Sequence, residues 1–412
     1  MQKPPIAITA LGVFAALAAL LPLGYLLIRL VAGAEKALGE LLRVRTLELL
    51  GNTLLLTVTV TVSAVAIGFF QAWLTTKTNL FAATFFAVAG TLPLAIPSYV
   101  LALSYTSIFP WFNGFFAAWL TLSLAMAPYV FLAVSAALIR SNANQEEVAR
   151  SLGMNSLQVL VKVTWPQVRP AAMAAGLLVA LYTLSEFGAV SILRFDTFTR
   201  AIYNAYRGSF DRTAAAALAV VLVLLTLIVL YFEKRYRTGY IKVEKQTRQL
   251  KINLGAWRFL ASGLLGLLAL GSSVLPISAL IGWSLAADDW DLTAISGALV
   301  ASLGIAISSG LVIGIFAVAV ALWNVRFQSK FSSGVELTIW SSHALPAIVA
   351  ALALVAVSLV VFPTWPTHWL HALRADVNDT QADGSTALHW ASYHDNAEAV
   401  EKLLAAGAKA EA

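Results

Sequence analysis

Long apolar runs constrain this chain more than any other feature of its sequence. A helix crosses the roughly 30 Å of bilayer hydrocarbon with about 20 apolar residues. Hydrophobic residues make up 59% of the 412 residues and charged residues only 12%, against about 25% charged in a typical soluble domain. We therefore predict an all-α fold, a polytopic transmembrane helical bundle in a lipid bilayer, with nine spans at 6–31, 51–74, 80–108, 115–140, 171–193, 213–232, 256–284, 297–323 and 335–361.

Two of these runs raise questions of their own. The run 80–108 contains Pro93 and Pro97, so we expect it to be kinked or broken there. The first run follows Lys3 and could be read as a signal peptide, but it is about twice as long as the usual apolar region of 7–15 residues. We expect an uncleaved first span.

The distribution of Lys and Arg sets the expected orientation. The linker 233–258 is strongly basic and should face the cytoplasm, which puts the polar loop 141–170 on the same side. The basic segment 194–212 argues the other way, because the same count places it outside. The net charge of +6 then reflects cytoplasmic loops, and we expect no nucleic-acid partner. With no cysteine in the chain, disulfides and thiolate chemistry are excluded.

The chain also contains an internal repeat. Thr53-Leu54 aligns with Ser302-Leu303, and Leu92–Leu103 aligns with Ser341–Leu352, both at an offset of 249 residues. A single match between apolar helices is weak evidence for a repeat. Two matches that share one offset without gaps are stronger evidence. Repeats in transporters build a pathway at their interface.

A polar segment between two long apolar runs is the most specific local signal. The sequence predicts a short helix from Gln145 to Leu152, with Glu147 near its start, where a negative charge is favourable. Ala149 and Gly153 would allow close approach and a turn, and Pro166 would begin the next helix. The alternative is an amphipathic helix lying on lipid headgroups.

This loop resembles the EAA loop of ABC importer permeases. The resemblance rests on E-x-A in Glu147-Val148-Ala149, on Gly153 four residues after the alanine, and on a hydrophobic-Pro pair ending at Pro166. It implies docking of a cytoplasmic ABC ATPase dimer, which would bind the ATP, since the chain itself offers no catalytic, metal or cofactor site. The docking residues implied are Glu146, Glu147, Ala149, Arg150, Leu152, Gly153 and Pro166. Val148 and Trp165 depart from the usual Ala and Leu.

Downstream strings resemble permeases of the ferric-iron type. These are Ser185-Glu186-Phe187-Gly188-Ala189-Val190, Asp196-Thr197-Phe198-Thr199 and Ala201-Ile202-Tyr203. The resemblance implies a multi-pass subunit of a cell inner membrane importer, not an enzyme, served by a periplasmic substrate-binding protein. Thiamine, sulfate or polyamine are the alternative cargoes.

Glu186 is the candidate pathway residue. It lies about 15 residues into the predicted span 171–193, or about 22 Å along a helix, and a carboxylate inside the membrane is by default a pathway or pairing residue. Pairing with Arg194, or a place at the outer interface, is an equally good reading.

The resemblance divides the chain into three regions. Residues 1–245 form a first permease half that contains the loop 141–170, residues 246–365 form an incomplete second half, and residues 376–410 resemble a single ankyrin-like repeat. The repeat offset predicts a second EAA-like loop near position 396, where the sequence has none. The alternatives are therefore a transport-deficient chimeric fragment, two chains paired as a homodimer, or a membrane-anchored ankyrin adaptor.

Overall fold

A computed structural model describes residues 4–208, 211–237, 251–286 and 292–327, with scattered single residues beyond that point. The chain separates into two compact units, Met1–Leu352 and Ala353–Ala412. In the described ranges the first unit is helical, apart from an isolated bridge between Thr78 and Ile252. The predicted span 335–361, the centre of the basic linker and the ankyrin-like region fall mostly outside the described residues.

Seven helices in the described part of the chain are long and apolar enough to cross a membrane, and a bent pair makes up to eight. The seven are Ile6–Ala32 (α1), Val44–Lys77 (α3), Gly114–Ile139 (α6), Ser156–Ser185 (α8, η2 and α9), Arg212–Phe232 (within α12, Arg212–Arg237), Trp257–Ala286 (α13, η4 and α14) and Ile295–Arg326 (within α15, Leu292–Arg326). The prediction of a polytopic helical bundle is confirmed.

The bent pair falls on the run with two prolines. Residues Ala83–Ala95, which contain α4 (Ala83–Ala89) and η1 (Leu92–Ala95), turn by 96° into α5 (Ser98–Ile108). Pro97 is the N-cap of α5. A residue before proline is pushed out of the helical region, and Ile96 is extended, with ψ 115°. The predicted break at these prolines is confirmed.

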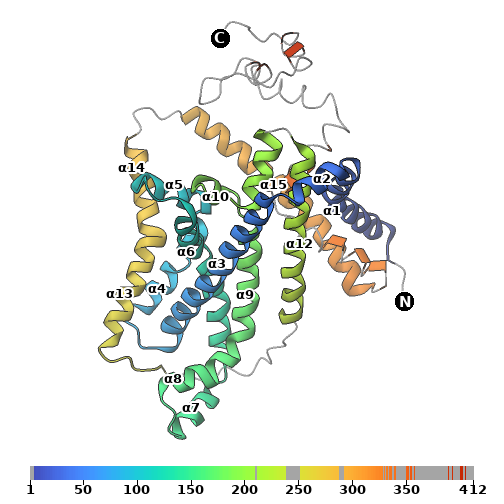
Figure 1. Cartoon of the computed structure of the whole chain (residues 1–412). Coiled ribbons are helices and arrows are strands. Elements are labelled where there is room, and N and C mark those ends of the chain that lie inside the picture. Colours follow the sequence, from blue (N-terminus) through green and yellow to red (C-terminus); the bar gives the residue numbers. More distant parts are fainter. Residues whose placement is uncertain are drawn as a thin grey trace. The chain divides into compact units, whose positions relative to one another are not determined.

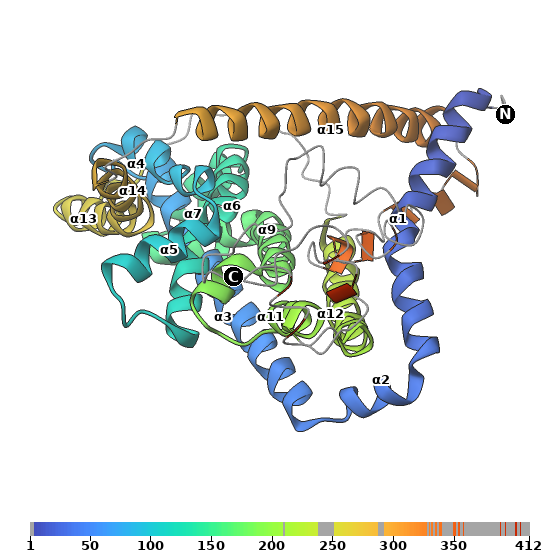
Figure 2. The same ribbon diagram turned by 90° about the horizontal axis from the view of Figure 1, so that it is seen from above.

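The centre of the predicted first half (residues 1–245) is a packed group of three helices. Gly68 of α3 meets the backbone of α6 so closely that a Cβ there would lie 2.7 Å from the Ala127 carbonyl oxygen. The third helix, α9 (Trp165–Ser185), packs against both, and its Gly176 faces Val65 of α3. Figure 2 shows α3, α6 and α9 side by side, viewed along the bundle. Small residues at helix contacts are the usual device for close packing in membranes.

The repeat seen in the sequence returns in the helix boundaries. Shifted by 249 residues, α3 would run from 293 to 326, and α15 runs from Leu292 to Arg326. The first span of each half packs on the other half. Phe14 of α1 stacks on Phe316 of α15 with ring centroids 5.6 Å apart, and α13 (Trp257–Ala269) and α14 (Leu275–Ala286) pack on α4 and α5.

The predicted span 171–193 has the wrong boundaries. The span expected at 171–193 begins at Ser156 and ends at Ser185, because the helix continues through the polar residues that looked like a loop. It does so through η2 (Leu160–Thr164), a π-helical turn directly before Trp165-Pro166. The same arrangement recurs at η4 (Leu270–Val274), directly before Leu275-Pro276. Proline cannot donate the next backbone hydrogen bond, and a π-turn accommodates the gap.

Candidate functional site

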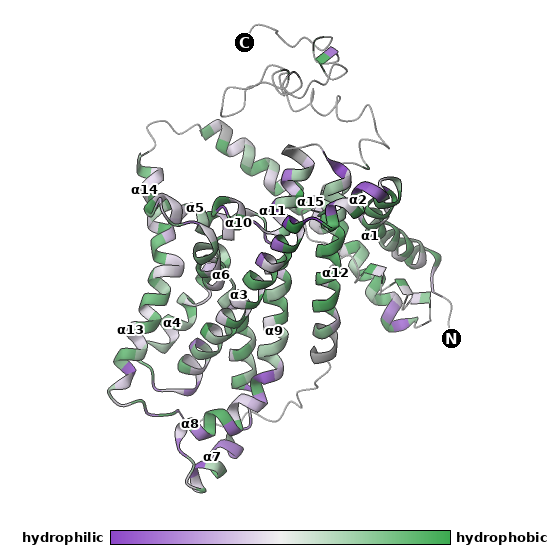
Figure 3. Ribbon diagram, in the orientation of Figure 1, coloured by the Kyte–Doolittle hydropathy of each residue, from purple (hydrophilic) through white to green (hydrophobic). Residues whose placement is uncertain are grey.

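A polar hairpin lies at one end of the bundle, as Figures 1 and 3 show. It consists of α7 (Ala143–Ser151) and α8 (Ser156–Val159), joined by a turn. The predicted helix Gln145–Leu152 is therefore present, but it begins two residues earlier. Glu146, not Glu147, lies in its first turn.

Local hydrogen bonds explain why this short polar segment folds. Asn142 caps α7 by accepting from the amides of Asn144 and Gln145. Helix α8 begins with a reciprocal capping box between Asn155 and Gln158, which satisfies two backbone donors at once. These caps supply helix stability that burial does not.

Gly153 closes α7. Its φ is +83°, a left-handed conformation that glycine adopts without strain. The Gly153 amide donates to the Arg150 carbonyl at 2.9 Å and the Met154 amide donates to the Ala149 carbonyl at 3.1 Å. This is the Schellman pattern of helix ends, so the turn expected at Gly153 is present.

The two faces of the hairpin differ. Ala149 is buried, together with Glu146. We call the exposed side chains of this segment the hairpin outer face. They come from α7, the turn after it, α8 and η2: Glu147, Val148, Leu152, Leu157 and Val161. Leu152 is 75% exposed and Leu157 69% exposed, although both are apolar and lie on the most polar hairpin of the bundle.

Glu146 does not lie on the hairpin outer face. Its carboxylate forms a buried ion pair with Lys77, the last residue of α3, with 3.1 Å between Nζ and Oε1. Thr164 Oγ1, from the π-turn η2, donates to the same oxygen at 3.1 Å, and Lys77 Nζ also donates to Ser141 Oγ at 2.8 Å. Residues far apart in the sequence are thus joined at the base of the hairpin.

Sequence reasoning missed Lys77, Ser141 and Thr164. A lysine at the end of an apolar run is typical of an interfacial anchor, and nothing in one sequence indicates that its side chain is only 2% exposed. Lys77 at the end of α3 and Glu146 in α7 form a pair of opposite charges. Only the folded structure shows that these two residues meet.

The remaining predicted residues occupy different places. Arg150 is half-buried, and its Nε and Nη2 have no hydrogen-bond partner among the described residues. Pro166 lies in the first turn of α9, but the helical run reaches it without a break from Ser156 through η2, so it does not begin a separate span as predicted. It lies behind the hairpin, where Gln167 of the same turn accepts from the Asn142 amide at 2.9 Å.

Glu186 lies at the opposite end of the bundle. It is the C-cap of α9, so its predicted position 15 residues into a span is wrong. Ser98 at the start of α5 donates to Oε2 at 2.9 Å, and the Ala189 amide of α10 (Gly188–Ile192) donates to Oε1 at 2.9 Å. The ion pairs among described residues do not include one with Arg194. Glu186 thereby connects the end of α9 to the start of α5 and to α10.

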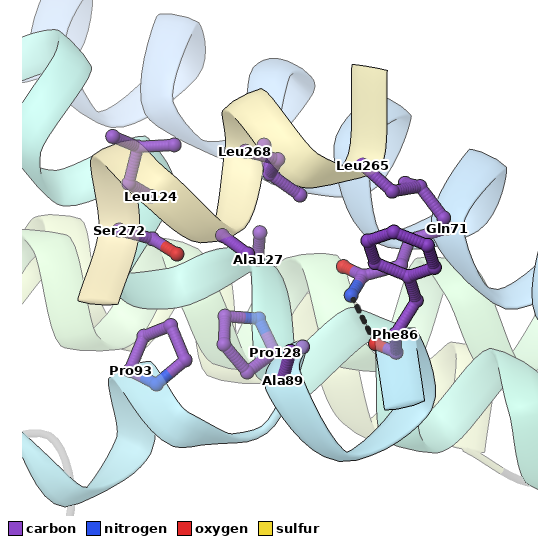
Figure 4. Close-up of a pocket in the computed structure, with 12 residues that line it drawn as sticks. Gln71, Phe86, Ala89, Pro93, Leu124, Ala127, Pro128, Leu265, Leu268 and Ser272 are labelled. Carbon is purple, nitrogen blue, oxygen red and sulfur yellow. Dashed lines mark hydrogen bonds between the residues drawn. The ribbon is translucent and has the colours of Figure 1, made fainter. Parts of the chain in front are cut away.

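A small cavity lies where α13 meets the first half (Figure 4). Two buried polar residues line it, Ser272 of η4 and Gln71 of α3, whose Nε2 donates to the Phe86 carbonyl at 3.4 Å. Gly90 allows this, because a Cβ there would overlap the amide nitrogen. The other walls are mainly apolar and come from α6 and α13, among them Leu124, Pro128, Leu265 and Leu268. The cavity is thus a packing junction between the halves.

Comparison with known sequences agrees with this architecture. Residues 64–238 match the model for "Binding-protein-dependent transport system inner membrane component", and residues 367–404 match the model for "Ankyrin repeats (many copies)". The first stretch contains the hairpin and Glu186. The second confirms the predicted ankyrin-like segment.

Individual relatives are transport permeases. The chain is 32% identical over 373 residues to the "Fe(3+)-transport system permease protein FbpB 2" of Haemophilus influenzae, covering 87% of this chain and 73% of the relative. It is 27% identical over 185 residues to the "Sulfate transport system permease protein CysT" of Salmonella typhimurium, covering 40% and 66%. A "Putative 2-aminoethylphosphonate transport system permease protein PhnU" of Salmonella typhi is 33% identical over 117 residues, covering 27% and 40%.

The first of these similarities extends well beyond the stretch matched by the family model and covers most of both proteins. Together with a multi-pass helical bundle and its polar hairpin, it is sufficient to assign the family. This chain belongs to the family of binding-protein-dependent transport system inner membrane components, the permeases of ABC importers.

Proposed function

We propose that this chain is the inner membrane permease of an ATP-driven importer for ferric iron. A periplasmic binding protein would deliver the cargo, and a separate cytoplasmic ATPase dimer would dock on the hairpin and hydrolyse ATP. The cargo assignment draws on similarity to a ferric-iron permease across 87% of this chain. Permeases named for sulfate and 2-aminoethylphosphonate share shorter stretches with this chain. Sulfate and phosphonate are therefore the competing cargoes.

The hairpin outer face is the observation that carries the docking proposal. The apolar side chains of Val148, Leu152, Leu157 and Val161 are exposed on a segment whose helix α7 is polar overall and lies at the end of the bundle. Several exposed apolar side chains on a short segment of a bundle end that we expect to face water favour contact with a partner. Basic residues near this end, Arg140, Lys162 and Arg169, favour its cytoplasmic orientation.

The natural absence of cysteine allows a direct test of docking. A single cysteine at Leu152 should react with a water-soluble maleimide in the permease alone and be protected when the ATPase of a ferric-iron importer from the same organism is bound. A cysteine at the exposed Glu35 of α2 (Ala34–Leu41), at the other end of the bundle, is the matched control and should react equally in both states. Equal labelling of Leu152→Cys in both states, with the ATPase bound, would refute docking on this face.

Cargo is tested by uptake. Proteoliposomes that contain the permease, the ATPase and the ferric binding protein should accumulate radioactive iron in the presence of ATP. Accumulation of sulfate with a sulfate-binding protein, and none of iron, would move the assignment to the sulfate class.

Two docking sites are needed if both ATPase subunits are to be held, and pairing of two copies of this chain would supply them. Cross-linking in detergent should then yield a dimer bound to two ATPase subunits. A cross-linked product containing one permease and no ATPase would contradict the pairing.

A further inference from the structure

The Lys77–Glu146 ion pair joins three separate elements. Lys77 ends α3, Glu146 lies in the first turn of α7, and Thr164 belongs to the π-turn η2. The side chains of the pair are 2% and 7% exposed, respectively. Lys77 Nζ and Thr164 Oγ1 both donate a hydrogen bond to Glu146 Oε1, each at 3.1 Å.

The backbone of Lys77 also pairs with the segment that leads into α13, the first helix of the predicted second half. The Lys77 carbonyl accepts from the Ile252 amide at 2.8 Å, and the Asn79 amide donates to the Ile252 carbonyl at 3.0 Å. The Asn79 side chain accepts from the Leu254 amide at 2.8 Å and donates to Asn253 Oδ1 at 2.8 Å. Helix α13 begins three residues after Leu254, at Trp257, so the end of α3 contacts both the hairpin and the first helix of the second half.

A buried ion pair is a poor source of stability, because removing two charges from water offsets most of their attraction. Apolar side chains of similar volume would hold a static loop at least as well. What such a pair does provide is a fixed geometry between the elements that carry it. Its burial also keeps Glu146 away from the hairpin outer face, so docking of a partner does not compete with it.

We infer that the Lys77–Glu146 pair is the mechanical link that transmits displacement of the docking hairpin to α3 and to the start of α13. The inference rests on the proposed function. Lys77 and Glu146 are positioning residues: they touch neither cargo nor nucleotide, and they act by making α7 and α3 move together.

The test uses the full-length permease with the same ATPase and binding protein as above. Glu146→Gln and Lys77→Met each leave one buried charge unpaired, which is strongly destabilising by itself, so a loss of function in either single variant is not diagnostic. The decisive variant is therefore the double change Lys77→Met with Glu146→Gln, which removes both charges. Lys251→Met removes an exposed lysine next to Ile252, at the same end of the bundle as Lys77, and is the control.

Three quantities separate linkage from docking: ATPase recovered with the permease, stimulation of ATP hydrolysis by the loaded binding protein, and iron uptake. We expect the double variant to retain the ATPase in wild-type amount, while stimulation and uptake fall by about ten-fold, within the usual range of coupling between sites. Exchanging the residues (Lys77→Glu with Glu146→Lys) should restore part of both. The control should match the wild type in all three measurements.

Two outcomes would overturn the inference. Wild-type stimulation and uptake in the double variant would mean that the pair is only structural, and loss of the ATPase from that variant would mean that the pair serves docking. Failure of the proposed function looks different, because the wild-type chain itself would then retain no ATPase.

Discussion

The hydroxyl of Tyr105 donates a hydrogen bond of 2.6 Å to the backbone carbonyl of Gly271. Tyr105 belongs to α5 in the first half, and Gly271 lies in the π-turn η4 of the second. Because a π-turn alters the helical hydrogen-bond pattern, it presents this carbonyl to a donor from a neighbouring helix. The bond fixes the second-half arm α13–α14 on the first half.

Tyr105→Phe should therefore weaken that attachment. The substitution removes a part-buried hydrogen bond, which costs about 0.5–1.5 kcal/mol. Chemical unfolding in detergent should show the loss, whereas Tyr99→Phe on the exposed side of the same helix should leave the midpoint unchanged. Equal midpoints for all three proteins would show that the bond contributes nothing.

Gly68 is predicted to be indispensable for packing. A Cβ at this position would lie 2.7–2.8 Å from atoms of Ala127, Val130 and Phe131, so Gly68→Ala must push α3 and α6 apart, with a cost of about 1–3 kcal/mol typical of overpacking. Gly51 is the matched control on the same helix, since no atom lies within 4 Å of its Cβ position. Gly51→Ala should be neutral or stabilising by up to about 1 kcal/mol, because alanine favours helices. Thermal unfolding of both variants compares the two effects.

The turn at Gly153 gives a local prediction. Gly153→Val forces a β-branched residue to φ +83°, at a cost of about 1–2 kcal/mol or more, whereas Gly153→Asn should be tolerated because asparagine adopts this conformation more readily. Hydrogen exchange of the Met154 amide, which donates to Ala149, should accelerate in the valine variant only. Recovery of the ATPase should fall with it. An unchanged exchange rate in Gly153→Val would contradict the Schellman turn.

Glu186 offers a way to separate a structural from a pathway role. Glutamine retains an oxygen that can accept from the Ala189 amide or from Ser98, so Glu186→Gln should keep the wild-type free energy of unfolding. Glu186→Ala removes both bonds and should lower that free energy by about 1–2 kcal/mol. If the carboxylate also contacts cargo, Glu186→Gln will fold normally but lose uptake. Normal uptake by Glu186→Gln would leave the carboxylate with only its structural role.

Asp211 should make stability dependent on pH. Burial alone would raise the pKa of this carboxyl, but the hydrogen bond from Lys36, together with backbone donation from Ala214 and the Lys36 charge, lowers the pKa below its usual value. Because the folded-state pKa is lowered, ionised Asp211 contributes to the free energy of unfolding at pH values above its unfolded-state pKa, near 3.9. This contribution is lost as the pH falls through the folded-state pKa. The difference in unfolding midpoint between wild type and Asp211→Asn should therefore be full at pH 7 and shrink as the pH falls below the unfolded value. A difference that is independent of pH would show that ionisation of Asp211 is not the cause.

The sequence predicted the spans because membrane thickness imposes a length that apolar runs must meet, and Pro97 marked the bend for a local steric reason. It misplaced the start of the span ending at Ser185 because Lys162 and Arg169 made helical residues look like a loop. The π-turn that carries the helix across Pro166 has no simple sequence signal.

The candidate site was predicted in outline but not in orientation. Spacing around Ala149 and Gly153 located the hairpin and its turn. It could not reveal that Glu146 faces inward, since its partner Lys77 is 69 residues away and only the packing of α3, α7 and η2 brings them together. The place of Glu186 at the end of α9 could not be predicted either, because its partner Ser98 belongs to α5, 88 residues away.

The exchange of first helices between the halves has a consequence for how the chain holds together. Helix α1 contacts α15, and α13–α14 contact α4 and α5, so each half carries a segment that the other half needs to complete its surface. The peptide connection between residues 237 and 251 is then not what keeps the halves associated. A chain cut there and synthesised as two polypeptides should reassemble in the membrane without a covalent tie, as a heterodimer of its own parts.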